Sequence, residues 1–440
     1  MKTAKRLVAL AAALPLALAM AACGDKDDAG NNGGAGDNGT TTAGNKLTVW
    51  CWDPAFNIYA MEEAGKIYKE DHADFELEVV EVPWDDLQTR LTTLAQSKQT
   101  EELPDIFLMQ NNAFQKNVIS YPELFTDFSK SGVDYSQYPE GIVAYSVIDG
   151  VNYGLPFDNG AAIDALRIDV LEEAGYTIDD FAGITWDDYL TIGKDVLAKT
   201  GKPLLSGQAG ASDLIMMIMQ SAGASLFDAE GTPTIVGNEA LEGAIEIYGQ
   251  LVEAGVMIEV NSWDEYIATF VNGEVAGTIN GSWIIGSITT AADQSGKWDI
   301  TDVPKLAGVA DATNYSANGG SSWAVSSNAD VELAMDFLKA TFAGSTELYD
   351  TILPSSGAIA NWIPAGASSV YEEPQEFFAG DAIYAKILEF TAKVPSNNTG
   401  VYYYEARDAV SVAITKILAG EDAQAALQEA QDTVDFAMGQ

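Results

Sequence analysis

Aromatic residues stand beside acids and amides at several points where an extended segment ends or a helix begins. A pyranose ring has apolar C–H faces and a rim of hydroxyl groups. A site for it therefore needs aromatic platforms, with amides, carboxylates and arginine for paired hydrogen bonds. These residue types predict a sugar-binding site. The candidate ligand-binding residues are Trp52, Asp53, Phe56, Asn57, Trp84, Asp85, Gln110, Asn111, Asn112, Asp158, Asn159, Trp283, Tyr403, Tyr404 and Arg407.

Residues for other chemistries are scarce. His72 is the single histidine, which excludes a histidine-based triad with a buried partner and any zinc site that needs two histidines. Cys51 stands between Trp50 and Trp52, and we expect it to be a small buried hydrophobic residue rather than a nucleophile. We find no Gly-x-Ser-x-Gly elbow and no phosphate loop. The sequence predicts no catalytic residue, no metal and no cofactor.

The chain begins with an export signal. Lys2, Lys5 and Arg6 precede an apolar run from Leu7 to Ala22, and two small residues stand directly before Cys23. This pattern predicts a signal peptide at residues 1–22 and a lipid on the thiol of Cys23. An ordinary signal cut elsewhere, or an uncleaved anchor, stays open as an alternative. We expect the protein on the extracellular face of the cell membrane.

Residues 23–45 contain Gly, Asn, Asp, Thr and Ala but no large apolar side chain, so we expect a flexible linker. The chain has 65 acidic against 22 basic side chains, a formal net charge of −43. Such a surface repels nucleic acid and anionic lipid headgroups. The long linker and the acidic surface favour a Gram-positive cell envelope, and we expect a monomer.

Extended and helical patterns alternate after Lys46 and predict a parallel sheet with helices on both faces. A hairpin with Asp149-Gly150 as its turn joins Tyr145–Ile148 to Val151–Phe157. A second alternating series follows, which implies two α/β lobes with a crevice at their carboxyl edges. The first series has strands at 47–52, 75–82 and 105–109, and helices at 57–70 and 85–97. The second has strands at 203–206 and 275–280, and helices at 186–199, 213–222, 239–254 and 263–271. The last stretch is rich in helices, at 331–343, 346–352, 381–393, 405–419 and 422–437.

Five motifs in chain order make residues 46–440 resemble the extracellular solute-binding proteins of ABC importers, in their maltose- and oligosaccharide-binding branch. They are Leu47–Trp50, Leu103–Ile106, Arg167–Gly175, Gly273–Trp283 and Tyr403–Arg407. By this resemblance Trp283, Tyr403, Tyr404 and Arg407 occupy the family's contact positions. Asn112 departs from it, because an amide stands where the family often has a carboxylate.

The resemblance implies an α/β, two-lobed periplasmic-binding-protein-like fold of type II, with the ligand cleft between lobes joined by a multi-segment hinge. The predicted N-terminal lobe comprises 46–158 plus 322–360, and the C-terminal lobe 159–318 plus 361–440. We expect the hinge crossings near Pro156–Gly160, Asn318–Ser322 and Ser356–Asn361, which are rich in Gly, Asn and Ser. The implied partners are an oligosaccharide of two or more units and the permease subunits of an ABC importer.

Two other functions remain open from the sequence. A cell-surface glycoside hydrolase needs two carboxylates at a set separation, and 65 acidic residues neither support nor exclude such a pair. The same fold could instead bind a peptide, a metal or a polyamine. A polyamine would need several cleft carboxylates beside aromatic rings, and Asp53, Asp85, Asp86 and Asp158 are candidates.

Overall fold

The computed structural model describes residues 45–228, 230–395 and 399–439. The predicted signal peptide, Cys23 and nearly all of the predicted linker lie outside these residues. The described residues all fall within one compact unit, 43–440, that contains two lobes. Among them, no helix combines the length and the apolar character needed to cross a bilayer.

The first lobe is built on a five-stranded sheet with the strand order β2-β1-β3-β12-β6. β1 pairs in parallel with β2 and β3, as the alternating pattern predicts, whereas β12 is antiparallel to both β3 and β6. Every residue of β6 and β12 is buried, which is typical of strands covered on both faces. The strands are β1 Lys46–Cys51, β2 Glu76–Glu81, β3 Ile106–Gln110, β6 Leu155–Asp158 and β12 Ser321–Val325.

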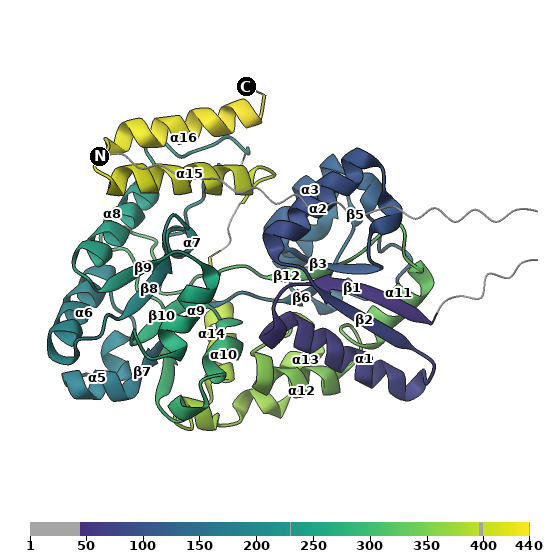
Figure 1. Cartoon of the computed structure of the whole chain (residues 1–440), viewed down its shortest axis with the longest axis horizontal. Coiled ribbons are helices and arrows are strands. Elements are labelled where there is room, and N and C mark those ends of the chain that lie inside the picture. Colours follow the sequence, from purple (N-terminus) through teal and green to yellow (C-terminus); the bar gives the residue numbers. More distant parts are fainter. Residues whose placement is uncertain (1–44, 229, 396–398, 440) are drawn as a thin grey trace, which may run out of the picture. The chain divides into compact units, whose positions relative to one another are not determined.

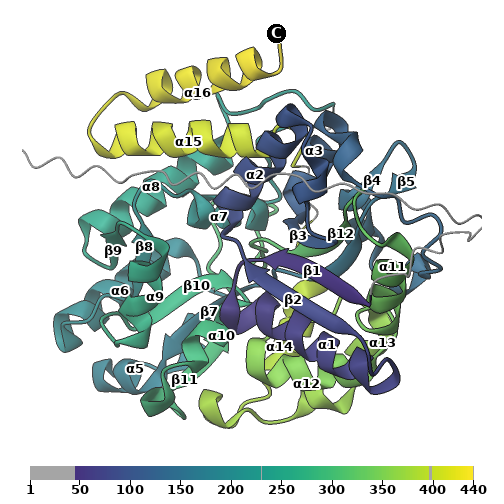
Figure 2. The ribbon, with the colours of Figure 1, turned by 45° about the vertical axis from the view of Figure 1, so that its right-hand side comes forward.

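Helices cover both faces of this sheet, as predicted. Leu47, Val49 and Cys51 alternate along β1 and face a core shared with α1, α11 and α12. The opposite face packs on α2 and α3 through residues such as Leu87 and Phe114. Figures 1 and 2 show α2 and α3 on one side of the sheet and α1 and α12 on the other. The helices are α1 Tyr59–Asp71, α2 Trp84–Ser97, α3 Phe114–Ser120, α4 Glu140–Val143, α11 Val331–Ala340, α12 Thr346–Ser356 and α13 Ile363–Gly366.

The second lobe differs from the simple alternating pattern. Its three-stranded sheet has the order β10-β7-β11 and is antiparallel throughout, while β8 and β9 form a separate parallel pair. β7 separates two cores, because Ala162 and Leu166 face one and Ile163 and Ala165 the other. The strands are β7 Ala162–Arg167, β8 Leu205–Gln208, β9 Met257–Val260, β10 Gly277–Gly281 and β11 Trp298–Thr301.

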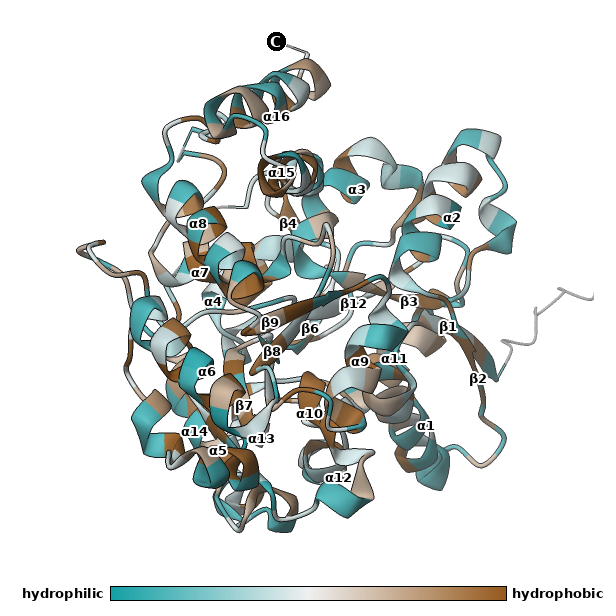
Figure 3. Cartoon of the chain, turned by 60° about the vertical axis from the view of Figure 1, so that its left-hand side comes forward, coloured by the Kyte–Doolittle hydropathy of each residue, from teal (hydrophilic) through white to brown (hydrophobic). Residues whose placement is uncertain are grey.

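Polar side chains cap the N-termini of several helices in the second lobe. Thr185 and Asp188 form the capping box that starts α6, and Trp186, the first residue of this helix, is buried in the core. Figure 3 shows hydrophobic residues, in brown, along the strands and hydrophilic residues, in teal, on α2. The helices are α5 Ile168–Ala174, α6 Trp186–Thr200, α7 Asp213–Ser221, α8 Glu239–Glu253, α9 Trp263–Val271, α10 Ile284–Thr289, α14 Ile383–Thr391, α15 Tyr403–Leu418 and α16 Ala423–Ala437.

The predicted hairpin is present but short. Asp149 and Gly150 have φ of 52° and 79° and connect β4 Val147–Ile148 to β5 Val151–Asn152. The second arm does not continue to Phe157 as one strand. The chain bends at Tyr153 and Gly154, and Leu155–Asp158 joins the large sheet as β6.

Three segments far apart in the sequence lie side by side next to the large sheet. Asp158 forms a bridge to Ala360, Ala161 forms one to Ala317, and the backbone N–H of Asn318 donates to the carbonyl of Gly160 at 2.6 Å. A Cβ on Gly160 would lie 2.0 Å from the oxygen of Asn318, so this close approach requires glycine. These are the neighbourhoods where the sequence predicts the lobes to be joined.

Candidate ligand-binding site

Three aromatic side chains from separate segments meet at the ends of the first-lobe elements. The rings of Trp52 and Trp84 make an edge contact with centroids 5.3 Å apart, and the centroid of Tyr404 lies 6.1 Å from that of Trp84. Trp52 follows β1, Trp84 opens α2, and Tyr404 lies in the first turn of α15. Tyr404 therefore brings a ring from α15 of the second lobe onto the first lobe.

Polar contacts accompany this aromatic contact. The hydroxyl of Tyr404 donates to Oε1 of Gln110 at the end of β3, and the Lys116 ammonium on α3 pairs with the Glu405 carboxylate. Lys116 Nζ also lies 5.8 Å from the centroid of the Tyr402 ring. Burial raises the pKa of the Tyr404 hydroxyl, so it remains a proton donor at neutral pH.

Arg407 lies one helical turn after Tyr404 and links it to α7. Its Cζ is 4.9 Å from the centroid of the Tyr404 ring, and its Nη1 is 3.8 Å from Oδ1 of Asp213, the first residue of α7. The neighbouring Tyr403 contacts Tyr404 edge-on at 5.3 Å. Aromatic rings, a guanidinium and a carboxylate thus follow one another across the surface.

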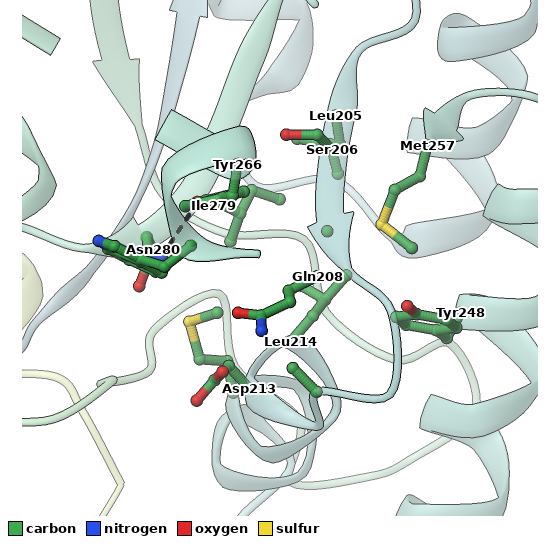
Figure 4. Close-up of a pocket in the computed structure, with 14 residues that line it drawn as sticks. Leu205, Ser206, Gln208, Asp213, Leu214, Tyr248, Met257, Tyr266, Ile279 and Asn280 are labelled. Atoms are coloured by element: carbon green, nitrogen blue, oxygen red, sulfur yellow. Dashed lines mark hydrogen bonds between the residues drawn. The ribbon is translucent and has the colours of Figure 1, made fainter. Parts of the chain in front are cut away.

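Two cavities adjoin Asp213. The larger, of about 220 Å³, lies between the loop that follows β8 and the side chains of Arg407, Asp408 and Ser411. The smaller, of about 50 Å³, is lined by Gln208, Trp263 and Asn280 among others. Figure 4 shows Gln208, Asp213 and Asn280 reaching toward a common space from β8, α7 and β10. Amide and carboxylate groups there can pair with ligand hydroxyls.

A second aromatic group lies at the end of β10. The rings of Trp263 and Trp283 are 5.8 Å apart, and Trp263 is 40% exposed. Asn280 donates to the hydroxyl of Tyr266 at 3.0 Å, a contact drawn in Figure 4, and accepts from Nδ2 of Asn318 at 2.8 Å. This network fixes the strand end that carries Trp283.

Several predicted residues of the first lobe organise loops within the protein. Asn57, fully buried, accepts the backbone N–H groups of both Trp52 and Asp53 at 3.0 Å. Asp53 caps the short helical turn Pro54–Ile58 by accepting from Ala55, and Phe56 packs on Phe157 in the core. Asn57 and Phe56 thereby set the conformation of the loop that presents Trp52.

Of the remaining predicted residues, some are exposed or half-buried, and others contact the segments that join the lobes. Asp85 is exposed in the first turn of α2, and Asn112 is half-buried in the turn after β3. Asn111 accepts a hydrogen bond from Ser322 at 2.7 Å. Asp158 is buried and accepts from the Ser321 hydroxyl, while Asn159 accepts from the backbone N–H of Ala161 at 3.0 Å.

The structure therefore brings together Trp52, Trp84, Gln110, Tyr403, Tyr404 and Arg407, and places Trp283 in the separate group with Trp263. The sequence-based candidates lacked Gln208, Asp213, Trp263 and Asn280, which line the cavities. Gln208 ends β8 and Asp213 begins α7, so the search for polar residues at strand ends and helix starts could have found them. In the described part of the chain, no group of three or more His, Cys, Asp or Glu side chains is arranged to hold a metal ion.

Comparison with known proteins identifies the family. The model of the bacterial extracellular solute-binding proteins matches residues 63–359, and the "lactose-binding protein" of Rhizobium radiobacter is 33% identical over 394 residues, covering 89% of this chain and 93% of the relative. The chain belongs to this family. Its members are binding proteins, and the two-lobed fold predicted from the sequence is confirmed.

Solved structures of solute-binding proteins share this fold. The GacH receptor of Streptomyces glaucescens superimposes with a TM-score of 0.75 at 17% identity, covering 90% of this chain and 98% of that one. The galacto-N-biose-/lacto-N-biose I-binding protein of the ABC transporter from Bifidobacterium longum, in complex with lacto-N-biose, gives 0.73 at 19% identity, covering 92% and 98%.

Proposed function

We propose that this protein captures an oligosaccharide between its lobes and delivers it to the permease of an ABC importer. The observation that carries the proposal is the row formed by Trp84, Tyr404, Arg407 and Asp213, in which an aromatic pair is followed by a guanidinium and a carboxylate. Aromatic faces suit the C–H surface of a sugar, and the charged groups suit its hydroxyls. The relative named for lactose supports the same ligand class.

Two separate aromatic groups favour a ligand of two or more sugar units. Trp52 and Trp84 with Tyr404 form one, and Trp263 with Trp283 forms the other. One hexose ring stacked in one group leaves the other free for a second ring. The two relatives with disaccharides in their names or complexes point to the same size.

We propose that binding shifts a population of open and closed lobes. The joining segments around Gly160, Asn318 and Ala360 would form the hinge, and the lobes would divide near the boundaries predicted from the sequence. A sugar that contacts both lobes stabilises the closed form by its extra contacts there. The permease would recognise that form, and the binding protein would act as a monomer.

We further propose that Cys23 carries a lipid and holds the mature chain on the extracellular face of the membrane of a Gram-positive cell. The basic start, the apolar run to Ala22 and the linker through residue 45 support this. Mass spectrometry of membrane-extracted protein tests it, because a diacylglycerol adduct on an N-terminal Cys23 peptide is expected.

A thermal-shift screen tests the ligand class. A ligand that binds only the folded protein raises its melting temperature in proportion to the logarithm of excess ligand. We expect a rise with neutral disaccharides such as lactose. A flat response to all sugars, with a rise for spermidine or for peptides, would overturn the sugar assignment while keeping the fold.

We propose that the bound sugar leaves unchanged, as for a binding protein and not a glycoside hydrolase. Prolonged incubation with oligosaccharides, followed by chromatography of the sugars, tests this. Recovery of intact oligosaccharide is expected, and release of shorter sugars at a rate that depends on protein concentration would contradict it.

A further inference from the structure

Among the described residues that line the larger cavity, Arg407 is the single cationic side chain, and the carboxylates of Asp213 and Asp408 lie beside it. Its Nη1 lies 3.8 Å from Asp213 Oδ1 and its Nε lies 3.7 Å from Asp408 Oδ1, while its flat face covers the Tyr404 ring. The guanidinium charge is therefore balanced within the protein before any ligand arrives.

The lengths of these contacts matter for what Arg407 can still bind. Charge-assisted hydrogen bonds between a guanidinium and a carboxylate are about 2.7–2.9 Å long, so both contacts neutralise charge without using the N–H groups fully. A guanidinium has five N–H donors. Arg407 can thus donate to sugar hydroxyl oxygens while offering little net positive charge.

Asp213 is the better placed of the two carboxylates to act on a ligand. It lines both cavities, and Figure 4 shows its carboxylate pointing into the space that Gln208 also faces. Its side chain is 46% exposed, whereas that of Asp408 is 72% exposed and faces water more freely. An ionised carboxylate accepts hydrogen bonds from hydroxyl groups and repels another carboxylate.

We propose that Asp213 is a specificity-determining residue that restricts the cleft to neutral sugars by neutralising Arg407 and repelling acidic ones. A uronic acid differs from the matching hexose by a carboxylate in place of a hydroxymethyl group. Near Arg407 that carboxylate would meet Asp213 and Asp408 at close range. Discrimination by such repulsion is a common route to specificity. This inference rests on the proposed sugar-binding function.

The test compares Asp213→Asn with the parent by titration calorimetry of the full-length protein in detergent, using lactose as the neutral probe and digalacturonic acid as the acidic one. Asparagine keeps the shape but removes the charge, and so leaves the Arg407 guanidinium balanced by the more exposed Asp408 carboxylate. We expect the parent to bind lactose tightly and the diacid only weakly. The variant should bind the diacid at least tenfold more tightly than the parent does, and the gain should shrink in high salt.

Asp408→Asn is the matched control, since it also removes one carboxylate beside Arg407 but an exposed one. Its gain for the diacid should be smaller than that of Asp213→Asn. Equal binding of both probes by the parent, or a folded Asp213→Asn protein with no gain for the diacid, would overturn the inference while leaving sugar binding intact. A parent that binds no sugar of any kind would overturn the proposed function, and this inference with it.

Discussion

The indole N–H of Trp283 donates a hydrogen bond of 2.9 Å to the backbone carbonyl of Asn318. The backbone N–H of Asn318 in turn donates to the carbonyl of Gly160, so the aromatic residue after β10 is bonded to one joining segment and connected through it to a second. In the proposed mechanism, a ligand that contacts Trp283 would act on the backbone that rotates when the lobes close. The hydrogen bond would then couple sugar contact to lobe position.

Two replacements of Trp283 should weaken sugar binding to different extents. Trp283→Ala removes both ring and hydrogen bond, and we expect the dissociation constant to rise more than tenfold, about 1.4 kcal/mol or more. Trp283→Phe keeps a ring but leaves the Asn318 carbonyl without its donor, which costs about 0.5–1.5 kcal/mol. Its dissociation constant should fall between those of the parent and Trp283→Ala in titration calorimetry.

Trp362→Phe is the control for this pair. Trp362 is buried, and its Nε1 donates to Gln137 at 2.8 Å within the first lobe. The same chemical change there should lower the melting temperature and leave the affinity unchanged. An unchanged affinity of folded Trp283→Ala would show that the second aromatic group is not part of the site.

The Lys116–Glu405 pair should favour the arrangement in which α15 rests on the first lobe. Both side chains are partly exposed, at 36% and 25%, so the pair contributes on the order of 0.2–1 kcal/mol. Lys116→Met should therefore raise the dissociation constant for sugar up to about fivefold. A double variant with the charges exchanged, Lys116→Glu with Glu405→Lys, should regain much of the sugar affinity that each single charge reversal loses. A double-mutant cycle measures this.

The Lys416–Glu429 pair offers a matched control on the same helix. It joins α15 to α16 at 2.5 Å, entirely within the second lobe. Lys416→Met should leave sugar affinity unchanged. If it weakens binding as much as Lys116→Met does, the first pair has no special role in lobe contact.

Asp158 should make stability depend on pH. Burial raises its pKa from 3.8 to about 7, although the Ser321 hydroxyl bonded to it works in the opposite direction. Between these values the folded protein keeps a proton that the unfolded chain has released, so the free energy of unfolding falls as pH rises toward 7. Asp158→Asn cannot ionise, and its melting temperature should decline less between pH 5 and pH 8 than that of the parent.

Asp264 provides the comparison for this measurement, because it is an exposed carboxylate in the first turn of α9. The melting curve of Asp264→Asn against pH should run parallel to that of the parent. A parallel curve for Asp158→Asn as well would show that Asp158 ionises as freely in the folded protein as in the unfolded chain.

Cys51 should be inert in the folded protein. The thiol is fully buried, and burial raises its pKa, so the reactive thiolate is scarce at neutral pH. We expect negligible labelling by a water-soluble thiol reagent in native buffer and rapid labelling in denaturant. Fast labelling of the native protein would mean that β1 opens locally.

Local pattern predicted most helices well. The range Trp263–Val271 expected from the sequence is also the range of α9, since Ser262 caps it and the apolar spacing is clear. β7, β9, β11 and β12 were not among the predicted strands. β12 begins with two serines and pairs with β3 from about two hundred residues earlier, a contact that no local window contains.

The sequence likewise predicted some of the residues that meet at the candidate site and missed others. Residue type, position at a helix start and, for Tyr404 and Arg407, the family motif selected Trp84, Tyr404 and Arg407, which the fold brings together. Residue type also selected Phe56 and Asn57, which the fold turns into the core of the first lobe. Asp213 was not selected although it begins α7, and its contact with Arg407 of α15 could be seen only in the folded chain.

The sequence by itself showed the acidic composition and the family motifs, and it predicted the alternating elements and an export signal, because each of these depends on composition or on residues that are close together in the chain. Tertiary structure alone decided which strands are antiparallel, which aromatic rings contact one another and that Asp213 lies beside Arg407. These outcomes depend on distances between segments separated by hundreds of residues, and such distances are set by packing and strand pairing rather than by local preference.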